Sequence, residues 1–172
     1  YWEETKPAHD FIVPDDVVDL AFGIACRCLP VDHLHALARA VHEALPWFAA
    51  EPWAGLHPIH VADSGNGWMR PENPEDLLYL SGRTRLVLRL SKERVADART
   101  LIGRTLDVGG HPLRVERATV RPLSVSTTIF SRYVVAGEEQ NEQGFIEQAV
   151  TRLQAAGIRP KKLLCGKERF IR

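Results

Sequence analysis

The apolar residues between positions 17 and 123 change repeatedly between two spacings, and this limits the folds that the chain can adopt. In residues 17–28, VVDLAFGIACRC, every second residue is apolar, which predicts a half-buried strand. Between Leu34 and Phe48 apolar residues recur every three or four positions, which predicts a helix with one buried stripe. Pro46 predicts that this helix ends or kinks there.

The same change of spacing continues along the chain. A short strand is predicted at 57–62, and residues 77–90 predict a hairpin. Residues 91–103 predict a second helix, and residues 105–123 predict a second hairpin. The two hairpin turns are Ser81-Gly82 and Gly109-Gly110, and the N-cap of the helix is Ser91.

Strand, helix, strand, strand, helix, strand is the order of the ferredoxin-like βαββαβ unit, an antiparallel sheet with both helices on one face. A second unit begins with a strand at 127–136, a helix at 141–157 and a strand at 161–172. We therefore predict an α+β protein with tandem ferredoxin-like (RRM-like) units. The first domain covers 1–124, and 125–172 is the β-α-β start of a second unit that is incomplete in this chain.

The charges of the chain are distributed unevenly, although its formal net charge is zero. Residues 1–80 contain 13 acidic and 4 basic side chains, whereas residues 81–172 contain 9 acidic and 18 basic ones. Such a division predicts a surface suited to a polyanion in the second part. The alternative is an uneven distribution without functional meaning.

The sequence argues against a membrane or secreted protein. No apolar run approaches the roughly 18 residues that a membrane span requires, and the first residues do not form a signal peptide. The 3 cysteines are an odd number, and Cys26 and Cys28 are poorly spaced to bridge. Reduced thiols in a cytoplasmic protein are the expectation.

Three histidines lie within residues 30–45, PVDHLHALARAVHEAL, at the start of the first predicted helix. Imidazole titrates near neutral pH and can act as a general acid or base. His33 follows the expected N-cap Asp32, where free N–H groups favour a phosphate. A solvent-exposed helix residue is the alternative for His33, and a solvated helix face explains His35 and His42.

His57 and His60, in HPIH, have a spacing that zinc ligands can have. No cysteine or carboxylate cluster accompanies them in the sequence. We therefore predict no metal site and no cofactor.

Six segments carry a resemblance to a known family. They are LPVDHLHAL (29–37), GLHPI (55–59), LLYLSGRTRLVLRL (77–90), LDVGGHPLRV (106–115), VRPL (120–123) and LLCGK (163–167). With these segments in this order, the chain resembles the CRISPR-associated repeat-RNA endoribonucleases of the RAMP superfamily. Within that superfamily it is most similar to the Myxan-subtype branch.

The resemblance implies a metal-independent endoribonuclease that cleaves CRISPR precursor RNA within each repeat to make guide RNAs. The 2′-OH attacks the adjacent phosphate and leaves a 2′,3′-cyclic phosphate and a 5′-OH. The partner is then CRISPR repeat RNA or guide RNA, and membership of a larger interference complex stays open. The family's catalytic histidine lies in or near the first helix, which implies His33, with His35 as the second candidate.

Two other classes of function remain open. The same superfamily contains non-catalytic guide-RNA-binding subunits of CRISPR interference complexes. A ferredoxin-like domain that binds a small molecule or another protein is the third possibility, and the histidines then have no catalytic role.

Basic side chains are expected to contact RNA phosphates and to neutralise the transition state. The candidates are Arg83, Arg85, Arg132, Lys161, Lys162, Lys167 and Arg169. Exposed arginines at a sheet edge that only increase solubility are the alternative. The family's glycine-rich loop near the C-terminus has no counterpart in these 172 residues, so we expect the C-terminal segment to be missing from this chain.

Overall fold

The computed structural model describes residues 15–61, 73, 75–124, 126, 128, 134 and 141–165. By its internal contacts the chain divides into two compact units, Tyr1–Val125 and Ser126–Arg172. The protein is an α+β protein, and each unit is described by itself.

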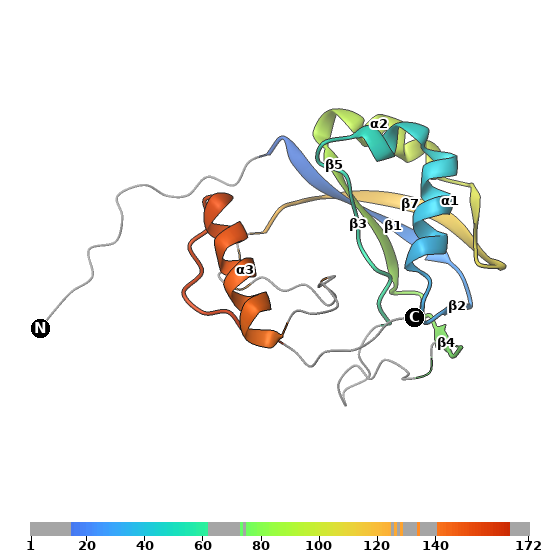
Figure 1. The fold of residues 1–172 in the computed structure, drawn as a ribbon. Coiled ribbons are helices and arrows are strands. Elements are labelled where there is room, and N and C mark those ends of the chain that lie inside the picture. Colours follow the sequence, from blue (N-terminus) through green and yellow to red (C-terminus); the bar gives the residue numbers. More distant parts are fainter. Residues whose placement is uncertain are drawn as a thin grey trace, which may run out of the picture. The chain divides into compact units, whose positions relative to one another are not determined.

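A curled antiparallel sheet of five strands forms the centre of the first unit (Figure 1). Its strands are β1 (Val17–Ala25), β3 (Gly55–Leu56), β5 (Arg85–Ser91), β6 (Thr105–Val108) and β7 (His111–Pro122). They are arranged in the order β3-β5-β1-β7-β6, and every neighbouring pair is antiparallel. The long β1 therefore lies in the middle, between β5 and β7.

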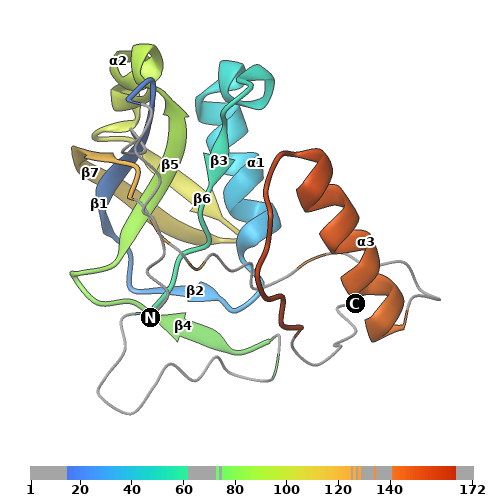
Figure 2. The ribbon, with the colours of Figure 1, turned by 90° about the vertical axis from the view of Figure 1, so that its left-hand side faces the viewer.

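Two short strands, β2 (Cys28–Pro30) and β4 (Leu77–Tyr79), form a separate two-stranded sheet (Figure 2). Cys28 lies opposite Tyr79 in this pair. Just before it, the backbone N–H of Leu80 donates to the carbonyl oxygen of Arg27 over 3.0 Å. The segments β1–β2 and β4–β5 thus run side by side as one interrupted antiparallel ribbon.

The hairpin predicted at 77–90 is wrong, because β4 pairs with β2 and β5 pairs with β1 and β3. A tight turn does occur there, since the N–H of Thr84 donates to the carbonyl of Ser81 over 2.9 Å. The two flanking strands, β4 and β5, pair with other strands and not with each other. The turn therefore interrupts the ribbon but does not form a hairpin. The strand predicted at 17–28 is likewise divided into β1 and β2.

The first predicted helix is confirmed as α1 (Leu34–Ala44), which is followed by the 3-10 helix η1 (Pro46–Ala50). Pro46 lies at the start of η1, because its ring cannot continue the α-helix. The described helices include none that is long and apolar enough to cross a membrane.

The second helical segment is divided into three short pieces, η2 (Lys92–Arg94), α2 (Val95–Ala98) and η3 (Arg99–Leu101). The expected N-cap, Ser91, makes no capping bond. Its hydroxyl instead donates to the carboxylate of Glu51. The hydroxyl of Ser91 thus bonds to a residue distant in the chain in place of the helix cap that the sequence predicts.

One hydrophobic core lies on one face of the five-stranded sheet, and Figures 1 and 2 show α1 lying along that face. The strands contribute alternate residues, and the helices contribute their apolar stripes. The most deeply buried members are Leu20, Phe22, Leu86, Leu88, Leu90, Val108, Leu113 and Val115 from this sheet, Leu29 from β2, and Leu37, Val41, Ala98 and Leu101 from the helices. Every second residue of a strand points to the same face of the sheet, and these buried residues point to the face that the helices cover.

The remaining predictions for the first unit have mixed outcomes. The hairpin turn at Gly109-Gly110 is confirmed, and both residues have the positive φ (+61° and +83°) that a two-residue turn requires. The strand predicted at 57–62 is wrong for 57–61, because β3 covers only Gly55–Leu56. Residue 62 lies outside the described residues.

The second unit contains α3 (Glu142–Ala155), which confirms the helix predicted at 141–157. The side chain of Asn141 caps it by accepting the N–H of Gly144 over 2.8 Å. A strand is predicted at 161–172, but residues 161–165 are not a strand, and the described part of this unit contains no strand with which they could pair. Residues 166–172 lie outside the described residues. The strand predicted at 127–136 is described only at 128 and 134.

Candidate functional site

His33 is a buried residue between β2 and α1, with 4% of its surface exposed. Its Nε2 accepts the backbone N–H of Ile59 over 3.2 Å, and its Nδ1 lies 2.9 Å from the carbonyl oxygen of Pro30. An imidazole nitrogen that accepts an N–H carries no proton, so the proton is on Nδ1, which donates to Pro30. The contacts thus hold His33 as one neutral tautomer.

His33 occupies the N-cap position of α1 but makes no capping bond with its side chain. The expected cap, Asp32, is exposed and does not occupy the N-cap position. The first turn of α1 also contains no acidic residue. The start of this helix is therefore an electropositive end that no side chain caps and whose first turn has no carboxylate, with Asp32 exposed just before it.

His35, the second catalytic candidate, is exposed on the first turn of α1. It is two residues from His33, but it points away from the core, because the amphipathic helix buries Leu37 and Val41 on its other side. His42 is exposed on the last turn, with its ring centroid 6.0 Å from that of Phe48. The three histidines of α1 thus have three different surroundings.

The turn between β6 and β7 packs close to the start of α1. A Cβ atom placed on Gly109 would lie 3.7 Å from Cγ of Pro30 and 3.8 Å from Cβ of Ala36. The first residue of β7, His111, is half-buried, and its Nδ1 lies 3.7 Å from Sγ of Cys28. Sequence reasoning did not select His111, because only the tertiary fold brings β7 to β2.

Cys26 and Cys28 are half-buried free thiols at the junction of β1 and β2. The thiol of Cys26 donates to the carbonyl oxygen of Cys28 over 3.3 Å. Burial raises the pKa of Cys26, although this hydrogen bond opposes the shift. Cys26 therefore keeps its proton to a higher pH than an exposed thiol does.

Four of the seven basic residues predicted to contact RNA are described. Arg83 is exposed in the turn before β5, and Arg85 folds back on that turn, with Nη1 donating to the carbonyls of Gly82 (2.9 Å) and Thr84 (2.8 Å). In the second unit, Lys161 and Lys162 are exposed. The other three, Arg132, Lys167 and Arg169, lie outside the described residues.

A polar network occupies the sheet face opposite the core. Asp19 on β1 accepts two hydrogen bonds from Arg89 on β5, at 2.8 and 3.0 Å. His57 lies beside them, with Nε2 3.7 Å from Oδ1 of Asp19. The hydrogen bond with Asp19 raises the pKa of Arg89. The positive charge of Arg89 is therefore paired with the carboxylate of Asp19 within the protein.

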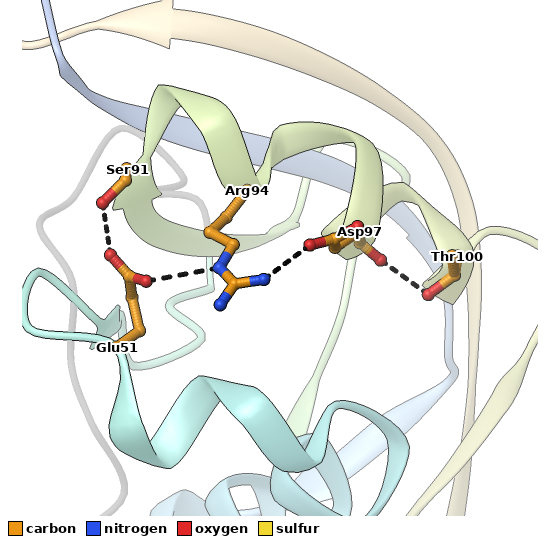
Figure 3. Close-up of polar contacts among 5 residues, drawn as sticks. All are labelled: Glu51, Ser91, Arg94, Asp97 and Thr100. Carbon is orange, nitrogen blue, oxygen red and sulfur yellow. Dashed lines mark hydrogen bonds and ion pairs between the residues drawn. The ribbon is translucent and has the colours of Figure 1, made fainter.

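A second network joins η1 to the start of the helical segment after β5 (Figure 3). Ser91 donates to Glu51, whose other oxygen lies 3.6 Å from Nε of Arg94. Nη1 of Arg94 lies 2.9 Å from Asp97, and the guanidinium lies 5.0 Å from the ring centre of Trp47. Two carboxylates and an indole face thus hold Arg94, so this network stabilises the fold rather than offering a free cation.

Within the described residues, no three side chains of His, Cys, Asp or Glu are placed to hold a metal ion. His57 and His60, whose spacing zinc ligands can have, lie on the segment after β3, where His60 is exposed.

Comparison with known proteins identifies the family. No curated protein matches the chain. The sequence model of the Cas6 CRISPR family, however, matches residues 18–172. The match begins in β1 and extends through α1, the start of which carries His33 and His35, to the C-terminal basic residues. Because it covers nearly the whole chain, the protein belongs to the Cas6 family of CRISPR repeat-RNA endoribonucleases.

Proposed function

We propose that this protein cleaves CRISPR precursor RNA within its repeats without a metal ion. The 2′-OH next to the scissile phosphate attacks it, which gives a 2′,3′-cyclic phosphate and a 5′-OH. Family membership supports the substrate. The observation that carries the chemistry is the exposed imidazole of His35 on the uncapped, acid-free first turn of α1. Such a helix start attracts a phosphate, and an imidazole beside it can transfer the proton.

We assign the proton transfer to His35 and a positioning role to His33. Both ring nitrogens of His33 contact backbone groups, of Pro30 and Ile59, and the ring is buried. An RNA 2′-OH could reach it only if the segment at Ile59 moved away. His33 instead fixes the end of β2 against the start of α1, which sets the place of His35. Catalysis by His33, which the family resemblance implies, stays a prediction that variants of both residues can test.

We further infer that the first unit is ferredoxin-like. The four strands β1, β3, β5 and β7, with α1 after β1 and the helical segment after β5, follow the chain order of a βαββαβ unit. Their spatial order, β3-β5-β1-β7, and the core on one face agree with it. A second such unit and the Myxan-subtype branch are proposals that depend on the sequence segments alone.

The exposed basic residues Arg83, Lys161 and Lys162 are proposed phosphate contacts. We propose the same for Arg85, which is half-buried and bonded to the backbone of its own turn. The residues outside the described ranges, Arg132, Lys167 and Arg169, keep this role as a prediction.

The test is cleavage of a repeat RNA in the presence of EDTA, followed by analysis of the product ends. We expect cleavage that is unaffected by the chelator, with cyclic phosphate on one product and 5′-OH on the other. Magnesium-dependent cleavage that leaves 5′-phosphate ends would contradict the mechanism. Tight binding of repeat RNA without any cleavage would instead favour a non-catalytic guide-RNA-binding subunit.

A further inference from the structure

Tyr79 is an aromatic residue on the small two-stranded sheet, and 68% of its surface is exposed. It lies on β4 directly opposite Cys28 on β2. Residues opposite one another in an antiparallel pair point to the same face, with Cβ atoms about 5 Å apart. The sulfur of Cys28 in turn contacts the ring of His111 at 3.7 Å. Tyr79, Cys28 and His111 therefore form a continuous row across β4, β2 and β7.

This row lies close to the proposed catalytic end of α1. Strand β2 contains only Cys28–Pro30, and Pro30 accepts the hydrogen bond from His33 at the start of α1. The two steps from Cys28 to Pro30 span roughly 7 Å along a strand. An RNA strand that places its scissile phosphate at His35 therefore has its neighbouring nucleotides within reach of Tyr79.

Two arginines are close to the row. Arg83 is exposed in the turn that follows β4, and Arg27 is exposed between β1 and β2. The backbone of Arg27 is bound to Leu80, the residue after Tyr79. Neither guanidinium forms an ion pair with a carboxylate within the described ranges, in contrast to Arg89 and Arg94. Both charges are therefore available to an external anion.

We propose that Tyr79 stacks on an unpaired nucleobase next to the scissile linkage, while Arg27 and Arg83 bind the adjacent phosphates. This inference rests on the proposed function and adds a base-binding subsite to it. Single-stranded RNA is commonly held by aromatic rings that stack on bases and by cations that follow the backbone. An exposed tyrosine ring beside two available arginines, one short strand from the helix start, meets both requirements.

The test measures the affinity of an RNA that carries 2′-deoxyribose at the scissile linkage, so that binding is observed without cleavage. Tyr79→Leu should weaken binding by about 5- to 150-fold, the range for the loss of one stacked base. Tyr79→Phe keeps the ring and should bind as the wild type does. Trp53→Leu is the matched control, because Trp53 is also an exposed aromatic (58%) but lies in the loop before β3, outside the row.

An abasic scan of the RNA identifies the stacked nucleotide. One abasic position beside the scissile linkage should weaken wild-type binding and leave the affinity of Tyr79→Leu unchanged. Arg27→Gln and Arg83→Gln should each reduce the slope of log K against log salt by up to about 0.7, whereas Tyr79→Leu should not change this slope.

The outcomes separate this inference from the proposed function. If the wild type neither binds nor cleaves repeat RNA, the proposed function fails, and the subsite fails with it. If the wild type cleaves but Tyr79→Leu binds as tightly as Trp53→Leu does, only the stacking subsite is overturned. A changed salt slope in Tyr79→Leu would also overturn stacking, since the effect would then be electrostatic.

Discussion

The N–H of Ile59 donates to Nε2 of His33 across 3.2 Å, which joins two residues 26 positions apart in the chain. This bond, together with the one from Nδ1 to Pro30, occupies both nitrogens of the ring. Two residues along α1, His35 is exposed. The structure thus separates a histidine that organises the start of the helix from one that a substrate can reach.

His33→Ala should destabilise the protein by about 1–3 kcal/mol, because the N–H of Ile59 loses its acceptor in a buried position. Urea unfolding followed by circular dichroism measures this change. Asp32→Ala is the matched control at the neighbouring exposed position, and we expect a change within about 0.5 kcal/mol. Equal stabilities for the two variants would show that the His33 bonds do not stabilise the fold.

His35→Ala should slow repeat-RNA cleavage by at least about 100-fold with little change in RNA affinity, because a general acid–base group is lost. His42→Ala removes another exposed histidine, at the other end of α1, and should cleave as the wild type does. Single-turnover rates measure the chemical step directly. If His35→Ala cleaves normally while folded His33→Ala is at least 100-fold slower, His33 is the catalytic histidine and our assignment is reversed.

Replacing both Lys161 and Lys162 by glutamate should weaken RNA binding. It should also flatten the dependence of log K on log salt, by up to about 0.7 per lost contact to single-stranded RNA. The same number of charge changes at two exposed acidic residues, Asp15→Lys and Asp16→Lys, should leave the affinity nearly unchanged or raise it slightly. Titrations at two salt concentrations measure both effects. Equal and opposite shifts in the two double variants would mean that net charge alone is responsible.

The thiol of Cys26 should react with iodoacetamide at a higher pH in the folded protein than in the unfolded chain. Burial raises the pKa of this thiol, so at a given pH the folded state contains less of the reactive thiolate. Rates at several pH values, with and without urea and read by mass spectrometry, measure the shift. A midpoint at the same or lower pH in the folded protein would contradict the effect of burial.

Much of the first unit could be predicted from the spacing of its apolar residues. Strand β1, helix α1, its end at Pro46 and the turn at Gly109-Gly110 all depend on local rules, and each is present. The hairpin predicted at 77–90 fails because strand pairing is not local. Each half of that segment pairs with β1 or β2, about 50 to 70 residues earlier in the chain.

The sequence by itself determined which segments are helices and strands in most of the first unit, and it drew attention to the histidines at the start of α1. Only the tertiary structure decided which histidine is buried and which is exposed. Helical spacing gives the face of a residue, but His33 lies at the N-cap, where the backbone leaves the helix. Its surroundings are therefore set by Ile59 and Pro30. The same reason explains the row of Tyr79, Cys28 and His111, since its three members come from three strands that only the folded sheets bring together.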